Sequence, residues 1–451
     1  MLFAVDNDDR TRGPRSVAAA GLSHKGERNV RKYLMPALVA LALFAAGCGS
    51  DNSSSSSGAT TTAGATTTAA ASGTSTTAAG ATTTGAATTA AATSAVANKD
   101  PINIALLGIE SGPNATDNRH NAIDLAVEEL NAKGGMSGHP VKYTAYDAGQ
   151  TPDQAATALQ KALGDKPNVI IGLPVTAQVQ ATAPLLGQSG IPVIHSAQSP
   201  NVGFAKLGVP SIYRMNVAAD KQTDAMVKYV TDNVKPKKVG LIYSTDTNST
   251  ESGQRIEAGL KAAGIDVTSR TVAPTATDTT EAVLAFKDVD ATISWTFPAV
   301  NSVFMKQRAQ NGLTAPHFMD TGGSTVVGLG LATGDELKGL SYVAQCDADV
   351  LTGPQVDSFK QAYQKKFGKL DYAASNPTNY DTLYFIDAMV KKANGSIAAK
   401  DLDAVMGTTD YTGVCGDLKT NADHDLMTTM YVVDASAGPT SKKLVATYKN
   451  S

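Results

Sequence analysis

The sequence predicts an α/β protein with two similar lobes, each a parallel sheet covered by helices on both faces. From residue 101 onward, short apolar runs alternate with amphipathic stretches of about 10–15 residues, which is the pattern of strand–helix units in a parallel sheet. The same alternation restarts near Asp220. The chain therefore repeats one architecture twice.

The first lobe is expected over residues 101–217. Strands are predicted at 102–109, 141–147, 168–174 and 190–196, with helices between them at 118–133, 151–163 and 176–186. The first helix is followed by Gly134 and Gly135, which suit a left-handed C-cap. The second begins after Thr151 with a proline directly behind it, a common helix start.

The second lobe is expected over residues 218–317. Strands are predicted at 237–244, 265–272, 291–297 and 316–320, with helices at 220–230, 250–264, 277–288 and 301–312. Residues 318–427 are expected to return to the first lobe, with a strand at 340–347 and helices at 354–367 and 377–393. The last strands, within 428–451, are assigned to the second lobe. Several crossings between the lobes would form a hinge.

The N-terminus has the parts of a bacterial export signal. Basic residues precede a short apolar run at 34–47, which is shorter than the roughly 20 residues of a membrane span. Small residues directly before Cys48 resemble a lipobox, the motif in which the cysteine is lipidated and becomes the mature N-terminus. We expect a signal peptide at 1–47, with a start codon nearer Val30; an uncleaved anchor helix is the alternative.

Residues 48–100 follow as a tract of Ser, Thr, Ala and Gly with almost no charge. Such a composition buries too little apolar surface to offset its ordering entropy, so it predicts a disordered tether. The folded part is thus expected at the outer face of the cell membrane, held by lipid. Residues 48–451 carry a net charge of −6, which argues against a nucleic-acid partner.

Two cysteines remain after Cys48, namely Cys346 and Cys415. In an exported protein a remaining pair favours a disulfide, although two unrelated buried thiols are the alternative. Two cysteines alone provide no metal-binding spacing, so we expect neither a metal nor another cofactor. Motifs for a nucleophile, a zinc protease or a nucleotide loop are also missing, and no catalytic residues are predicted.

The chemistry of the predicted strand ends points to a binding site. In open α/β sheets, ligands bind beyond the carboxyl ends of the strands, where this chain places hydroxyls, small residues and helix starts. Helix N-terminal amides with Ser and Thr hydroxyls suit a carboxylate. Thr176 and Ser199 are candidates, although both could be simple helix caps. His195 also lies at a strand end.

Several stretches resemble one family. LAVEELNAKGGMSG at 125–138 is the most specific, and VIIGLPVT, GIPVIHSAQSP, YRMNVAADKQTDAMVKYV and NYDTLYFIDAMVKKA add to it. They resemble the leucine/isoleucine/valine-binding proteins, the type I periplasmic binding proteins of amino-acid ABC transporters. The resemblance spans roughly residues 101–435. It implies two Rossmann-like lobes joined by a hinge of several crossings.

The resemblance also implies a ligand site. It places the ligand carboxylate at Thr176, Ala197 and Ser199. Family members usually add an aromatic side chain and an acid that holds the ammonium group, but this chain has Ser252 at the aromatic position. Near the other strand end it offers Trp295 and Phe297 without an acid. Asp246 or Asp320 would then supply the charge; otherwise the ligand lacks an ammonium group.

These features together imply a monomeric, exported, lipid-anchored protein that captures a small polar solute for an ABC permease. The solute would be an amino acid, an amide or a small carboxylate, enclosed by hinge closure. A ligand sensor of the same fold that signals to a membrane receptor or kinase is an alternative. An exported enzyme is a further one, against which the missing nucleophile–base pair counts.

Overall fold

The structure, a computed structural model, describes residues 99–449 apart from 113, 116–119, 370–374 and 428. The expected signal peptide at 1–47, Cys48 and the tether up to residue 98 lie outside the described residues. The described residues all belong to one compact unit. None of the helices within the described ranges is long and apolar enough to cross a membrane.

The first sheet is entirely parallel, with the strand order β2-β1-β3-β4-β5. Its strands are β1 (Ile102–Gly108), β2 (Val141–Asp147), β3 (Val169–Gly172), β4 (Val193–His195) and β5 (Ile212–Arg214). The first four match the predicted strands. The sequence analysis does not predict β5, because three residues carry too little periodicity to stand out from a loop.

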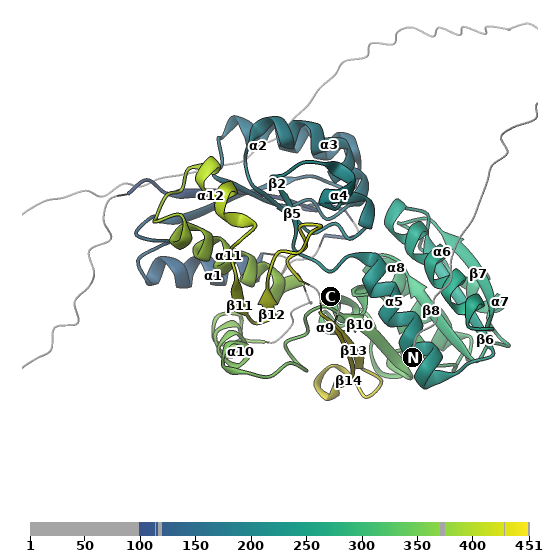
Figure 1. The fold of residues 1–451 in the computed structure, drawn as a ribbon. Helices are drawn as coiled ribbons and strands as arrows, with labels where there is room; N and C mark the ends of the chain where they lie inside the picture. Colours follow the sequence, from purple (N-terminus) through teal and green to yellow (C-terminus); the bar gives the residue numbers. More distant parts are fainter. Residues whose placement is uncertain (1–98, 113, 116–119, 370–374, 428, 450–451) are drawn as a thin grey trace, which may run out of the picture. The chain divides into compact units, whose positions relative to one another are not determined.

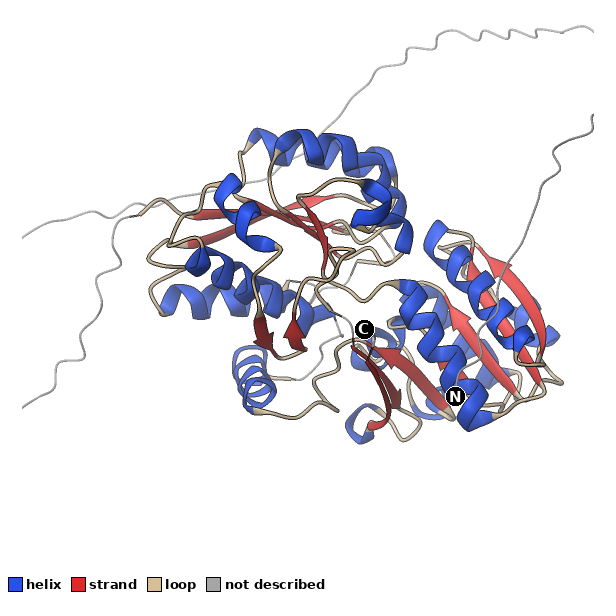
Figure 2. Ribbon diagram, in the orientation of Figure 1, coloured by secondary structure: helices blue, strands red, loops and turns tan. Residues whose placement is uncertain are grey.

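Helices lie on both faces of this sheet, as Figure 2 shows. They include α1 (Asn121–Ala132), α2 (Pro152–Gly164), α3 (Thr176–Ser189) and the short α4 (Phe204–Leu207). Both faces are covered because side chains along β1 point alternately to the two faces and are apolar on each. Ile104 and Leu106 join the core beneath α1, whereas Ala105 and Leu107 join the core beneath α2 and α3.

The second sheet has seven strands in the order β14-β13-β10-β9-β8-β6-β7. Its strands are β6 (Lys238–Ser244), β7 (Asp266–Val272), β8 (Ala291–Trp295), β9 (His317–Met319), β10 (Leu340–Ala344), β13 (Thr429–Asp434) and β14 (Lys443–Lys449). The helices with it are α5 (Ala219–Tyr229), α6 (Thr247–Ala262), α7 (Thr280–Ala285), α8 (Pro298–Gln310) and α9 (Gly322–Gly328). Strands β6 to β10 pair in parallel, and β13 and β14 are antiparallel.

The boundary expected at residue 318 needs a correction. Strand β10 pairs with β9 in parallel, so the second lobe continues to Ala344 before the chain returns. The physical reason is that α9 is a crossover helix between two neighbouring parallel strands. The expected return to the first lobe from residue 318 therefore assigns this segment to the wrong sheet. The C-terminal strands β13 and β14 extend the second sheet beside β10.

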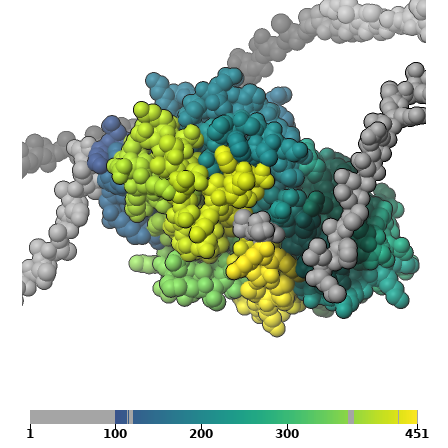
Figure 3. Space-filling model, viewed as in Figure 1, coloured from purple at the N-terminus to yellow at the C-terminus, as the bar shows by residue number. Residues whose placement is uncertain are grey.

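The chain then returns to the first lobe as α10 (Pro354–Phe367), α11 (Ser375–Lys392), α12 (Ala399–Met406) and the hairpin of β11 (Tyr411–Gly413) and β12 (Gly416–Leu418). Helix α11 packs along α1, and Tyr380 and Tyr384 both donate hydrogen bonds to Glu129 of α1. Figure 3 shows this yellow-green segment directly against the blue and teal surface of the first lobe.

The chain crosses between the sheets in three places: after β5, after β10 and before β13. The first two crossings are connected by a hydrogen bond. The side chain of Gln345 accepts a hydrogen bond from the Val217 amide at 2.9 Å, which ties the second crossing to the first. A disulfide joins Cys346 on the second crossing to Cys415 on the hairpin β11–β12.

The disulfide should contribute strongly to stability, because it closes a loop with a sequence separation of 69 residues. We expect the Cys346→Ala/Cys415→Ala variant to lose roughly 3–5 kcal/mol in its free energy of unfolding, measured by urea denaturation. Alanine avoids burying an unpaired hydroxyl at these two buried positions. The reduced parent protein should match the variant. Equal stability of variant and oxidised parent would contradict this role.

Candidate functional site

A cavity of about 360 Å³ is lined by the carboxyl ends of strands from both sheets. From the first lobe it receives residues after β1, β3 and β4, and from the second lobe residues after β6, β8 and β9. The start of α11 and the first two crossings complete the lining. The position agrees with the rule that α/β sheets bind ligands beyond their strand ends.

The end of β3 is shaped by Gly172. This residue has a φ of +109°, and a Cβ atom here would lie 2.3 Å from the Leu107 carbonyl oxygen of β1. Only glycine permits both the backbone angle and this close approach. The turn lets the chain reach Thr176, the first residue of α3, at the cavity wall.

Thr176 and the first turn of α3 form a polar corner of the cavity. The Thr176 side chain is 3% exposed, and its Oγ1 is buried without a hydrogen-bond partner among the described residues. Val175 at the cap position has no side-chain acceptor for the first-turn amides of this 14-residue helix; the Gln178 side chain accepts a hydrogen bond only from the Val175 amide, at 3.4 Å. A hydroxyl and helix N-terminal amides favour a negatively charged group here.

The start of α6, in the second lobe, presents hydrogen-bond acceptors to the cavity, whereas the Thr176 corner presents donors. Asp246 caps this helix by accepting a hydrogen bond from the Ser249 amide on Oδ1 at 3.1 Å. Its other oxygen, Oδ2, and the Oδ1 of Asn248 are buried with no partner in the described part of the chain. Both residues line the cavity, so two acceptors remain for a donor inside it.

Asp320, after β9, lines the same cavity. Its Oδ1 accepts hydrogen bonds from the Gly322 amide at 3.0 Å and from Asn301 at 3.3 Å. Burial raises the pKa of Asp320 to about 8; those two hydrogen bonds oppose the rise, and the nearby Asp246 adds to it. This side of the cavity therefore combines two carboxyl groups, and burial favours the protonated form of Asp320.

Glu110 adds a third carboxyl group from the first lobe, where it pairs with His120 at 3.0 Å. The described residues of the lining include no Lys or Arg. Arg119, next to His120, lies outside the described residues. The described lining thus has an acidic character apart from the Thr176 corner.

Four of the eight expected ligand residues line the cavity, namely Thr176, Asp246, Phe297 and Asp320. Phe297 is the aromatic residue that precedes α8, and the lining near it is completed by Thr296 and Pro298.

The other four expected contacts lie elsewhere, which corrects those assignments. Ala197 is fully buried in the core under α2 and α3, and Trp295 is fully buried in the core of the second lobe. His195 is 1% exposed and contacts the Val202 carbonyl at 3.1 Å, and burial and the nearby Arg214 lower its pKa to about 3. Ser199 hydrogen-bonds to Glu251 instead.

Side chains of the extended segment after β4 point alternately to its two sides, and this alternation explains why three expected contacts there do not line the cavity. Ser196 and Gln198 line the cavity, whereas the residues next to them, His195, Ala197 and Ser199, do not. A shift of one residue exchanges the two sides of an extended segment. Ser252, at the position of the family's aromatic residue, is likewise buried in α6 and outside the lining.

Sequence reasoning also missed several lining residues. Asn114 and Asn248 lie in strand-end segments that were recognised as polar, but neither was selected; the Oδ1 of Asn114 is buried and without a partner in the described ranges. Thr378, Asn379 and Thr382 come from the start of α11. No local signal marks them, because their place depends on the return of the chain.

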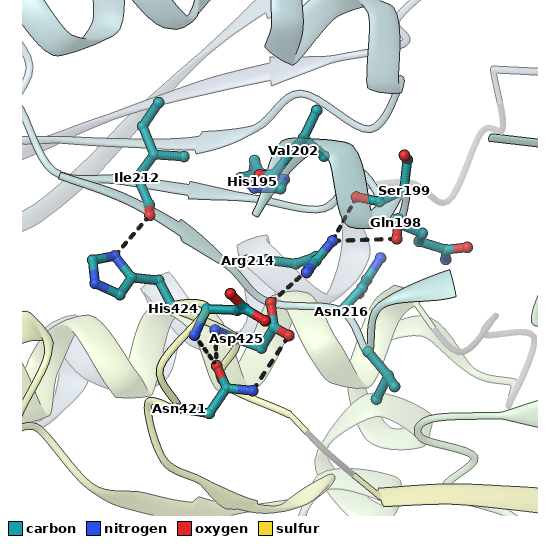
Figure 4. A network of polar contacts seen from close by, with 12 residues as sticks. His195, Gln198, Ser199, Val202, Ile212, Arg214, Asn216, Asn421, His424 and Asp425 are labelled. Carbon is teal, nitrogen blue, oxygen red and sulfur yellow. Dashed lines mark hydrogen bonds and ion pairs between the residues drawn. The ribbon is translucent and has the colours of Figure 1, made fainter. Parts of the chain in front are cut away.

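The segment after β4 is held by a buried arginine, shown in Figure 4. Arg214 is 2% exposed, and its Nη1 donates hydrogen bonds to the carbonyls of Gln198 at 3.2 Å and Ser199 at 2.7 Å. Its Nε donates to Asp425 at 2.7 Å, on the segment that leads into the third crossing. Arg214 therefore fixes the backbone from which Gln198 reaches the cavity.

The site is equipped to hold a ligand. Its polar groups are hydroxyls, amides and carboxyls from two lobes, and within the described ranges no cluster of His, Cys, Asp and Glu could hold a metal ion. Several of the polar atoms are buried and unpartnered, which is unfavourable unless another molecule pairs with them.

The sequence matches the family model described as periplasmic binding protein over residues 101–440. The Leu/Ile/Val/Thr-binding protein of Salmonella typhimurium is 24% identical over 339 residues, covering 72% of this chain and 91% of that protein. The Leu/Ile/Val-binding protein of Escherichia coli K12 is also 24% identical, with 72% and 90% covered.

Solved structures agree with this fold. The branched-chain amino acid binding protein LivJ of Streptococcus pneumoniae, in complex with isoleucine, has a TM-score of 0.68 at 20% identity, covering 76% of this chain and 99% of that chain. A solute-binding protein of an ABC transporter from Rhodopseudomonas palustris, in complex with 3,4-dihydroxybenzoic acid, has a TM-score of 0.69 at 20% identity, covering 78% and 98%. The chain therefore belongs to the type I periplasmic binding protein family, with the leucine/isoleucine/valine-binding proteins among its relatives.

Proposed function

We propose that this protein captures a small solute that carries both a carboxylate and an ammonium group, an amino acid in the simplest case, and delivers it to an ABC permease. The observation that carries the proposal is the opposed polarity of the cavity walls. A hydroxyl and a helix N-terminus lie on the first lobe, and two carboxyl groups lie on the second.

The first-lobe corner suits the carboxylate of the solute. Thr176 Oγ1 has no partner in the described residues and would donate a hydrogen bond to an anionic oxygen, beside the uncapped amides of α3. Ser196 and Gln198 supply further polar groups at the neighbouring strand end. Phe297 would cover an apolar part of the solute from the second lobe.

The second-lobe wall suits the ammonium group. Asp246 Oδ2 and Asn248 Oδ1 are acceptors without a donor in the described part of the chain, and Asp320 lies at the next strand end. A bound cation would stabilise both carboxyl groups in their ionised form, so Asp320 would release its proton on binding. The acid that the family resemblance places after β8 would thus be replaced by acids after β6 and β9.

Benzoates, which some of the similar structures hold, fit this wall less well. An unsubstituted benzoate would satisfy the Thr176 corner but bring no donor to the buried acceptors of Asp246 and Asn248. A hydroxybenzoate would bring a neutral O–H donor but no positive charge to face the two carboxyl groups. Leaving buried carboxylates unpaired in a closed cavity is costly. The described lining therefore favours a zwitterion.

Capture would proceed by closure of the two lobes around the solute. The solute would dock at one wall, and rotation about the three crossings would bring the other wall against it. Only a solute that pairs with both walls would stabilise the closed form. The closed form would then be presented to the permease, with the protein anchored outside the membrane through Cys48.

The first prediction from the proposed function concerns the solute. Amino acids should raise the melting temperature of the full chain, because a ligand at about 100 times its dissociation constant adds roughly 2.7 kcal/mol of stability. Asp246→Asn should then weaken binding of the amino acid by about 10–100-fold in calorimetry. It should leave binding of the matching des-amino acid almost unchanged.

The exposed Asp288, on the same lobe, provides a matched control as Asp288→Asn. Thr176→Val is the complementary test, because it removes the hydroxyl at nearly constant volume and should weaken both solutes together. If benzoates stabilise the protein while no amino acid does, the assignment of the ammonium site is wrong.

The second prediction follows from the raised pKa of Asp320. The folded protein keeps a proton between pH 4 and pH 8 that the unfolded chain releases, so its free energy of unfolding should fall as the pH rises through this window. Asp320→Asn removes this dependence and keeps the Oδ1 acceptor. Because the side chain remains partly exposed to the cavity, we expect the parent to lose roughly 1–3 kcal/mol relative to the variant.

Urea denaturation from pH 4 to pH 9 would measure the difference. The unfolding curves of the parent and of Asp320→Asn should converge at pH 4 and separate towards pH 8. Parallel pH profiles for the two proteins would show that Asp320 is ionised in the folded state throughout.

The third prediction concerns the anchor. Cys48→Ala should move the protein from the membrane fraction to the soluble fraction of cells that express it, because the lipid attaches through this thiol. Cys346→Ala/Cys415→Ala is the matched control, since it removes the other two thiols and should leave the protein on the membrane. Retention of Cys48→Ala on the membrane would exclude the lipobox.

A further inference from the structure

Contacts between the lobes also exist outside the ligand cavity, and they converge on Glu251 of α6. Its Oε2 accepts a hydrogen bond from Ser199 Oγ at 2.5 Å, and its Oε1 accepts one from Asn201 Nδ2 at 2.5 Å. Glu251 belongs to the second lobe, whereas Ser199 and Asn201 follow β4 in the first lobe. None of the three residues lines the cavity.

We propose that Glu251 is a clasp that holds the two lobes together without touching the solute. Because both of its carboxylate oxygens are engaged by donors of the other lobe, its bonds exist only when the lobes are apposed. It therefore sets the balance between open and closed forms for every solute alike. Selectivity would be left to the cavity wall.

The backbone that carries the donors of the clasp is held by contacts within the first lobe. The Ser199 hydroxyl accepts a hydrogen bond from the Asn201 amide at 3.1 Å, which sets the turn at Pro200–Val202. Arg214 donates a hydrogen bond to the Ser199 carbonyl and is itself paired with Asp425 (Figure 4). Little conformational entropy is lost on contact, and hydrogen bonds to a carboxylate are among the stronger ones.

A second contact between the lobes lies within the cavity lining, unlike the contacts of Glu251. Gln198 Nε2 donates to Thr321 Oγ1 at 3.2 Å, but both of these residues line the cavity. A solute would change that contact directly. The Glu251 contacts are separate from the solute and are also charge-assisted, so they can act on closure alone.

The test measures the distance between the lobes of the full chain with no solute added. Spin labels on an unnatural amino acid at Gln160 and Lys287, two exposed positions on different lobes, leave the disulfide untouched. Pulsed electron paramagnetic resonance then gives the distance distribution. In Glu251→Ala the ratio of closed to open protein should fall about tenfold relative to the parent.

Asn201→Ala should produce a smaller shift in the same direction. The double variant should add little to Glu251→Ala, because the hydrogen bond lost in Asn201→Ala is already lost in Glu251→Ala. Glu251→Gln should fall between, since its amide oxygen still accepts one bond. Glu257→Ala is the matched control on the same helix, because its partners Lys261 and Ser269 belong to its own lobe.

Melting curves by circular dichroism would identify any variant that fails to fold, in which case Asn201→Ala carries the test. An unchanged distance distribution in the folded variants would overturn the proposal, as would additive effects of Asn201→Ala and Glu251→Ala. Neither outcome bears on the identity of the solute, so the clasp and the proposed function fail separately.

Discussion

The buried guanidinium of Arg214 is the interaction on which the arrangement of the site depends. A charge with 2% exposure needs a counter-charge, and Asp425 supplies it from a segment more than two hundred residues away in the chain. The same guanidinium holds the backbone after β4, which carries both a cavity wall and the donors for Glu251. One buried charge therefore connects the ligand wall, the contact between the lobes and the third crossing.

The other crossings are constrained in a similar way. Gln345 accepts a hydrogen bond from Val217 and donates one to Asn216, so the first two crossings share one amide side chain. Cys346, the next residue, forms a disulfide with Cys415 of the returning segment. These hydrogen bonds and the disulfide restrict how the crossings can rotate. In the proposed closure, the two lobes would therefore move along one path and not independently of each other.

Much of the fold could be predicted from the sequence, because strand and helix periods are local properties. Eleven of the observed strands could be assigned in this way, but β10 was attached to the wrong lobe, since pairing partners are not encoded in a period. The site was predictable to the level of strand ends. Thr176, Asp246 and Asp320 follow from that rule, whereas His195 and Ala197 were misplaced by the alternation of an extended segment. Thr378 depends on the return of the chain, which no local pattern reveals.

The return segment has a consequence for the order of folding. One face of the first sheet is covered by α1 together with α11, and these two helices lie far apart in the sequence. During synthesis, the first lobe can form its sheet early, but the apolar side chains of α1 that pack against α11 stay exposed until α11 has been made. The N-terminal lobe thus becomes complete only after the second lobe has been made. A fragment that ends after β5 would therefore expose the surface that α11 normally covers, and it should aggregate more readily than the whole chain.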